Sequence, residues 1–210
     1  SAAELAAAVA ELQALRGATV LEAVPLAGAS GCDDLLLVLQ LPLQSEGEHA
    51  RKAFVLLAPG GQRARICTTS RRWPKDAFLR GPTRDALHRE LAGATLQHLV
   101  QPDGERRCTF GFRTAVGDRQ LVVELFGARG LWALLDAESR VLSLSRDVQT
   151  AVRTLRLGEP YSPPPAASGV AGEPPRAEAE PRFAAPVLAA IDALYTEHDL
   201  AADGIREHEL

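Results

Sequence analysis

Short strand patterns far outnumber helical patterns in this chain, and little sequence separates one strand from the next. Apolar stretches of four to eight residues, alternating or continuous, predict strands. About nine such stretches fall near residues 18–24, 34–41, 52–58, 63–69, 94–100, 106–113, 119–126, 131–135 and 139–145. Their connections are rich in Gly, Pro, Ser and Asp, as turns require. Most strands are therefore expected to pair as hairpins or meanders.

Two amphipathic helices are predicted beside these strands. The first begins at Ser1, which has capping-box spacing with Glu4, and ends before Gly17. Its apolar face carries Leu5, Val9, Leu12 and Leu15. The second begins near Pro82 and stops at Gly93. Its inward residues are expected to be Leu87, Leu91 and Thr83. Two helices among so many short strands predict an α+β fold, a two-sheet β-sandwich flanked by two helices, rather than a parallel α/β sheet.

The composition changes from Glu159 to Pro186, where eight of 28 residues are proline. Such a segment has too few apolar residues to order itself, which predicts a mobile linker. We therefore divide the chain into a domain at 1–165, a Pro/Ala/Glu-rich linker at 166–185 and a C-terminal helix at 186–210. The helix has the apolar spacing of a coiled-coil seam. The seam positions are Leu188, Ile191, Tyr195, His198, Ala202 and Ile205. A lone amphipathic helix docked on its own domain is the alternative.

Positive charge is concentrated in one part of the chain. From Arg63 to Arg119 there are 12 basic and six acidic side chains, a net charge of +6, whereas the remainder carries 11 basic and 21 acidic side chains, a net charge of −10. Eleven of the 12 cations are arginines, whose forked donors suit phosphate. The pattern fits an electrostatic footprint for nucleic acid. It equally fits a solvated face in a protein that uses Arg in place of Lys.

Residue types that would indicate catalysis or metal binding are scattered. The histidines are isolated from one another, at positions 49, 88, 98, 198 and 208, and none has a partner at ligand spacing. Cys32, Cys67 and Cys108 are odd in number and contain no C-x-x-C pair, which is typical of reduced thiols. No apolar run reaches the roughly 20 residues of a membrane helix, and the first residues do not form a signal peptide. We therefore expect a cytoplasmic, non-enzymatic protein without metal or cofactor.

The order of motifs from residue 121 to 165 resembles a known family. The strand "LVVELFG" is followed by "LWALLD", then by "SLSRDV" and "RTLRLGEPYSPPP". This order resembles the N-terminal domain of the NFACT family, once labelled fibronectin-binding protein A, which includes the alanine-tailing factor of ribosome-associated quality control. The resemblance implies a domain similar to the N-terminal domain of formamidopyrimidine-type DNA glycosylases, a two-sheet sandwich with a helix on each side. It also implies that the helix at 186–210 opens a longer helical arm.

The chain departs from the family pattern in three places. An Asp-Arg pair that supports tRNA recognition in the family falls by position on Glu105 and Arg106, with Glu replacing Asp. The family's Gly-Arg-His-Ser-Asn turn reads "GARGL" from Gly127 to Leu131. The interval from Pro165 to Phe183 is too short for the helix-hairpin-helix module found there in relatives. The resemblance is thus to a divergent member that lacks this module.

The resemblance implies an RNA-binding module that contacts tRNA and the large ribosomal subunit, with no membrane or DNA partner. The residues expected to contact tRNA are Glu105, Arg106, Arg107, Arg84, Arg89, Arg65, Arg71 and Arg72. Trp73, in a loop among arginines, is a candidate for base stacking or a core side chain. The rival readings are a protein-interaction module whose RNA binding has decayed, and a matrix-binding adhesin as in the old family name.

Overall fold

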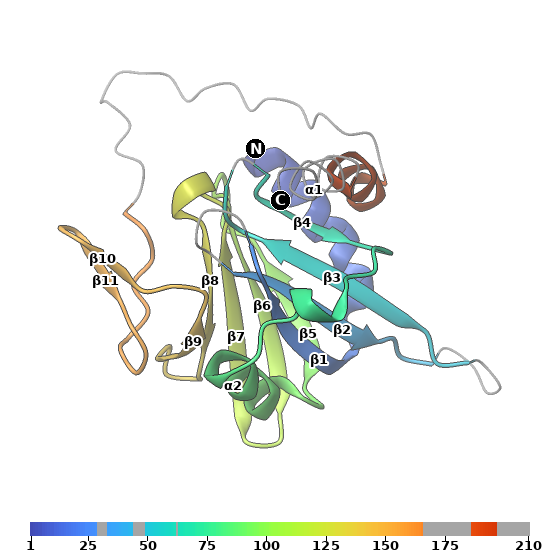
Figure 1. Ribbon diagram of the computed structural model, residues 1–210, viewed down its shortest axis with the longest axis horizontal. Coiled ribbons are helices and arrows are strands. Elements are labelled where there is room, and N and C mark those ends of the chain that lie inside the picture. The colour runs from blue at the N-terminus through green and yellow to red at the C-terminus, as the bar shows by residue number, and fades with distance from the viewer. Residues whose placement is uncertain (29–32, 44–48, 62, 166–185, 197–210) are drawn as a thin grey trace.

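The computed structural model describes residues 1–28, 33–43, 49–61, 63–165 and 186–196 (Figure 1). The helices are α1 (Ala2–Leu12) and α2 (Pro82–Leu91), a further helix at residues 187–196, and the 3₁₀ turns η1 (Gln13–Leu15), η3 (Lys75–Ala77) and η4 (Gly127–Arg129). The strands are β1 (Thr19–Leu26), β2 (Asp34–Gln40), β3 (Lys52–Ala58), β4 (Arg65–Thr68), β5 (Thr95–Val100), β6 (Arg107–Thr114), β7 (Gly117–Glu124), β8 (Leu131–Leu135), β9 (Val141–Leu144), β10 (Val148–Thr150) and β11 (Arg153–Leu155).

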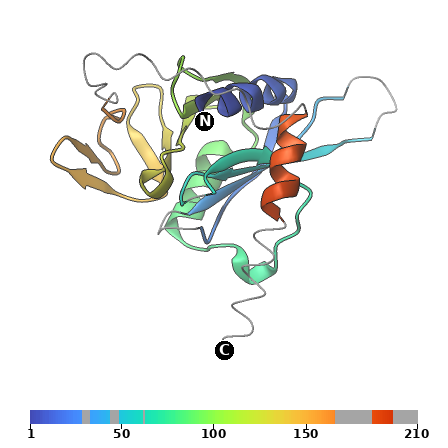
Figure 2. The same cartoon turned by 90° about the horizontal axis from the view of Figure 1, so that it is seen from above.

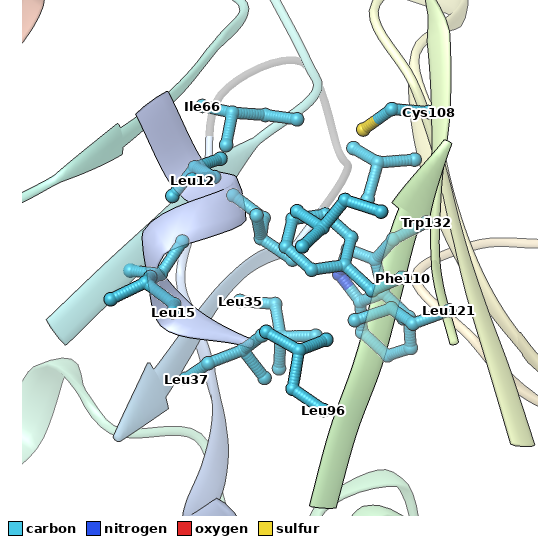
Figure 3. Close-up of a cluster of buried hydrophobic side chains, with 14 of the residues drawn as sticks. Leu12, Leu15, Leu35, Leu37, Ile66, Leu96, Cys108, Phe110, Leu121 and Trp132 are labelled. Carbon is cyan, nitrogen blue, oxygen red and sulfur yellow. The ribbon is translucent and has the colours of Figure 1, made fainter. Parts of the chain in front are cut away.

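Nine of these strands form one antiparallel ladder in the order β4-β3-β2-β1-β5-β6-β7-β8-β9. The junction between β1 and β5 is a single residue pair, Thr19 with Thr95, whereas β1 and β2 pair over seven positions. The ladder can bend sharply there, and its halves β4-β1 and β5-β9 face each other (Figure 1). Figure 3 shows apolar side chains from both halves meeting, among them Leu35, Leu37, Phe110 and Trp132. The predicted α+β fold is confirmed, with the two layers of the sandwich joined at one edge.

The two helices seal this core, as the sequence predicts. Ser1 Oγ accepts a hydrogen bond from the Glu4 backbone N–H at 3.2 Å, and the Glu4 side chain returns to the backbone of Ser1, which completes the capping box. The buried residues of α1 are Glu4, Leu5, Ala8, Val9 and Leu12. Leu87 and Leu91 of α2 are fully buried. The apolar faces of α1 and α2 thus pack in the same core cluster as the side chains of the sheet.

Strand β2 is buried on both faces, which explains its nearly continuous apolar sequence. Successive strand residues point to opposite faces. Leu35, Leu37 and Leu39 therefore reach the central core, whereas Leu36 packs on the opposite face with Val187 and Ile191. The helix at 187–196, orange-red in Figures 1 and 2, thus forms a third layer over β2 and its neighbours.

Glu11 of α1 holds the start of the helix at 187–196. Its carboxylate oxygens accept hydrogen bonds from the backbone N–H groups of Val187 and Leu188, at 2.5 and 2.9 Å. These are first-turn donors with no partner inside their own helix. Leu188 and Ile191, two positions of the expected coiled-coil seam, are 6% exposed and pack on the domain itself. For residues 187–196 the structure shows the docked-helix alternative.

Several expectations fall outside the described residues. They concern the linker at 166–185 and the residues Cys32, His198, Ala202, Ile205 and His208. Cys67 and Cys108 are both buried, and burial raises the pKa of the Cys108 thiol to about 12. Within the described parts of the chain, no helix has the length and apolar character needed to span a membrane.

Candidate nucleic-acid interface

The seven predicted arginines do not form one cluster, and four of them lie on the two sides of the helix at 187–196. On one side, Arg65 and Arg106 line a small cavity of about 50 Å³ together with Ile191 and Tyr195. The Arg65 guanidinium lies 5.0 Å from the centre of the Tyr195 ring, and Arg65 is only 8% exposed. Arg106 is exposed, immediately before β6. Of the two, Arg106 is the one placed to reach a ligand in solution.

Glu105 is paired with Arg107, not with the neighbouring Arg106. The Glu105 Oε2 atom accepts a hydrogen bond from Arg107 Nε at 2.9 Å. Arg107 begins β6, and its side chain is 18% exposed. Burial lowers the pKa of Arg107, but interactions with Glu105 and Tyr161 outweigh it, so the net pKa is raised. The Arg107 side chain is therefore mostly buried beside a Glu105 carboxylate that is 43% exposed, and Arg106 is not part of this pair.

An ionic network joins three residues of the stretch between 121 and 165. Glu124, fully buried at the end of β7, accepts two hydrogen bonds from the Arg153 guanidinium at 2.8 and 2.6 Å. The Tyr161 hydroxyl donates to Glu124 Oε1 at 2.7 Å. Burial and the Glu124 charge raise the pKa of Tyr161. The sequence motif contained all three residues, but linear spacing gave no indication that they meet.

On the other side of the helix at 187–196, Arg71 and Arg72 line a broad groove of about 1190 Å³. Trp73 also lines it, partly buried, with the Arg71 guanidinium 5.3 Å from its ring centre. The other lining residues are Leu36, Lys52, Ala53, Phe54, Thr68, Thr69, Ser70, Phe78, Ala189, Asp192, Ala193 and Thr196. We refer to this space as the β2–β3 groove.

Arg84 lies in a second hollow of about 240 Å³, lined also by Glu22, Val24, Lys75, Phe78 and Arg80. Phe78 borders both hollows, so they adjoin. Lys75 and Arg80 are not among the contacts predicted from the sequence. They lie in the irregular segment between β4 and α2, and the sequence does not show which side chains of such a segment share a surface. Arg89 borders neither hollow and donates to Glu90 Oε1 at 2.9 Å.

Three of the six acidic residues of the basic segment form ion pairs within it. Glu90 bridges to Arg119 of β7 at 2.9 Å, and Asp118 pairs with Arg113. The Glu105 pair with Arg107 is a third example. The cations lining the two hollows are Lys52, Arg71, Arg72, Lys75, Arg80 and Arg84, and the acids lining them are Glu22 and Asp192. The two hollows therefore form a locally basic surface, which suits a polyanion.

The altered turn after β7 has a packing reason. A Cβ atom on Gly130 would lie 1.8 Å from the carbonyl oxygen of Pro59, so only glycine fits there. The backbone at Gly130, just before β8, thus lies directly against the backbone of Pro59, which follows β3. Among the described residues, no three His, Cys, Asp or Glu side chains gather as metal ligands would.

Comparison with known proteins gives a consistent result. The family model described as NFACT N-terminal and middle domains matches residues 5–188. Three solved structures have a similar fold. They are the N-terminal part of the fibronectin/fibrinogen-binding protein from Streptococcus suis (TM-score 0.63, 21% identity, 79% of this chain and 61% of that chain), the fibrinogen-binding protein from Staphylococcus aureus (0.60, 18%, 78% and 56%) and the N-terminal domain of fibronectin-binding protein PavA from Streptococcus pneumoniae (0.63, 21%, 78% and 61%).

The chain spans 56–61% of the length of these solved chains. At this identity the similarity shows a shared fold. No curated protein matches the chain.

Proposed function

Because this chain belongs to the NFACT N-terminal family, we propose that it is a cytoplasmic, non-enzymatic RNA-binding module that contacts tRNA and the large ribosomal subunit. In ribosome-associated quality control, such a module positions tRNA on the large subunit, and the ribosome supplies the peptidyl-transfer chemistry. We include in this proposal that the complete protein supports the addition of C-terminal alanine tails to peptides stalled on the large subunit.

The observation that carries this proposal is the distribution of positive charge. A chain with a net charge of −4 places six cations around two adjoining hollows, with the exposed Arg106 on the other side of the helix at 187–196. Arginine and lysine contacts to phosphate supply most of the affinity of sequence-independent nucleic-acid binding. A basic patch on one face of a protein is the electrostatic feature expected for such binding, even when the net charge of the protein is negative.

Electrophoretic shifts with total tRNA at low and moderate salt test this function. We expect weak binding that falls steeply with salt, because each phosphate contact releases a counterion. Absence of a shift at low salt and high protein concentration would contradict tRNA binding and favour a protein-interaction module. Co-sedimentation with purified large subunits tests the ribosomal part of the proposal separately.

A second candidate function is binding of fibronectin or fibrinogen. The observation in its favour is that the three similar structures are described as fibronectin- or fibrinogen-binding proteins. To distinguish the two functions, binding to surface-immobilised fibronectin and fibrinogen is measured with the same protein sample that is used in the tRNA shifts. Saturable binding to either protein without a tRNA shift would establish the second candidate in place of the first.

A further inference from the structure

The β2–β3 groove contains an aromatic side chain, Phe54, that the described residues leave partly exposed. Phe54 and Leu56 are two residues apart on β3 and therefore point to the same face. Leu56 packs in the cluster that includes Val187 and Ile191 and is 3% exposed, whereas Phe54 is 37% exposed. The helix at 187–196 thus covers one part of this sheet face and leaves the Phe54 part open to the groove.

Two further aromatic residues border the same space. Trp73 and Phe78, from the segment between β4 and α2, line the groove with Phe54. The Arg71 guanidinium, 5.3 Å from the Trp73 ring centre, adds a planar cationic group to this aromatic wall. Flat aromatic rings and guanidinium planes are the surfaces on which unstacked bases pack.

The charge of the groove selects an anionic occupant. Lys52, Arg71 and Arg72 line it, and among the described residues that do so only Asp192 is acidic. Asp192 lies on the helix at 187–196, whose other side borders the cavity with Arg106. An acidic peptide would use the cations, but only its aromatic residues would pack on the three rings, whereas every nucleotide carries both a phosphate and a planar base. A nucleic-acid strand uses both.

We propose that the β2–β3 groove binds an unpaired segment of RNA, with one base stacked on Phe54 and neighbouring phosphates on Lys52, Arg71 and Arg72. The segment is unpaired because bases inside a duplex are already stacked on one another and present no free face. This inference rests on the RNA-binding function proposed above and assigns it a site that the sequence motifs did not indicate. Asp192 weakens the interaction by repelling the phosphates.

Fluorescence anisotropy with a labelled uridine octamer tests the proposal, using the whole 210-residue chain. Phe54→Leu keeps an apolar side chain but removes the flat ring, so the octamer affinity should fall about fivefold or more, as loss of one base–aromatic stack does. Phe54→Tyr keeps the ring and should bind as the native protein does. Asp192→Asn should strengthen binding about two- to fivefold, a gain that misfolding does not produce. Arg156→Glu, an exposed change in the other half of the molecule, serves as the charge control.

The outcomes separate this inference from the broader function. If native protein binds tRNA but Phe54→Leu binds the octamer equally well, the groove assignment is wrong and the tRNA function stands. Equal affinity for the octamer and for a blunt RNA duplex would also overturn it, because phosphate contacts alone would then explain binding. If the octamer binds in the Phe54-dependent way and tRNA does not, the groove assignment holds and the tRNA function fails. Binding of neither RNA refutes both.

Discussion

The most constrained residues are the three of the buried network, Glu124, Arg153 and Tyr161. Glu124 ends β7 and Arg153 begins β11, so their bidentate pair connects the main ladder to the β10–β11 hairpin. Tyr161 brings the following segment onto the same carboxylate. Residue spacing in the sequence identified these positions as a motif. It could not show their pairing, because an ion pair between positions 29 residues apart depends on the fold.

We expect Arg153→Ala to lower the free energy of unfolding by about 3–5 kcal/mol, because it leaves the Glu124 carboxylate buried without its cation. Tyr161→Phe should cost about 1.5–3 kcal/mol, since it removes one hydrogen bond to a charged group. Urea unfolding measures both, and the exposed Arg156→Ala should change stability by less than about 0.5 kcal/mol. A cost below about 1 kcal/mol for Arg153→Ala would mean that this network does not hold the hairpin in solution.

Arg106 and Arg107 are adjacent but should behave differently. Arg106 is exposed, whereas Arg107 is paired with Glu105 and only 18% exposed. Arg106→Ala should therefore weaken tRNA binding with little change in stability, and Arg107→Ala should lower stability with a smaller direct effect on binding. Anisotropy with labelled tRNA and thermal unfolding of both variants check this. The reverse ranking would show that the family's acidic-Arg pair has been assigned to the wrong arginine.

At the scale of elements, the sequence predicted helices and strands well wherever apolar periodicity was strong. Strand β3 was predicted at its observed bounds of Lys52–Ala58, and α2 begins at Pro82 as expected. The sequence does not predict the β10–β11 hairpin. Each of its strands has only three residues, too few to show an alternating pattern, and the apolar Val152 at the turn is exposed and not part of the core. The spacing of residues 186–210 is compatible with both a coiled-coil seam and a helix docked on its own domain. The key contact of the docked helix, Glu11 with Val187, spans 176 positions.

Helix α2 is attached to the sheet by Glu90, and this contact should respond to pH. Burial alone would raise the pKa of Glu90, but hydrogen bonds and charges from Arg89 and Arg119 outweigh it, so the pKa lies below its ordinary value of 4.5. A carboxyl group whose pKa is lowered by folding stabilises the protein above its unfolded pKa. That stabilisation is lost as the pH falls through the folded pKa.

Glu90→Gln should therefore cost about 1–2 kcal/mol at pH 7, between the values for exposed and fully buried ion pairs. The difference from the native protein should shrink as the pH is lowered from 5 to 3, as measured by urea unfolding at each pH. Asp103→Asn, which removes an exposed carboxylate outside the helices, is the control. A difference that stays constant over this range would show that the Glu90 charge does not contribute.

At the scale of the whole molecule, the fold explains how residues distant in sequence reach one surface. The ladder bends at the single pair between Thr19 and Thr95, and the helix at 187–196 lies over the β2–β3 face between Arg106 and the β2–β3 groove. The class of fold followed from strand and helix counts. The division of the predicted arginines did not, because it depends on where a helix from the far end of the chain docks.

Hydrogen exchange with and without tRNA, read by mass spectrometry, tests the central claim most directly. Bound tRNA should slow exchange in residues 69–84, which border the two hollows, and around Arg106. Exchange in β10 and β11, which lie outside both hollows, should not change. Raising the salt concentration should remove the protection, since the contacts are to phosphates. Unchanged exchange throughout, or protection confined to β8–β11, would contradict the assignment of this basic surface as an RNA-binding site.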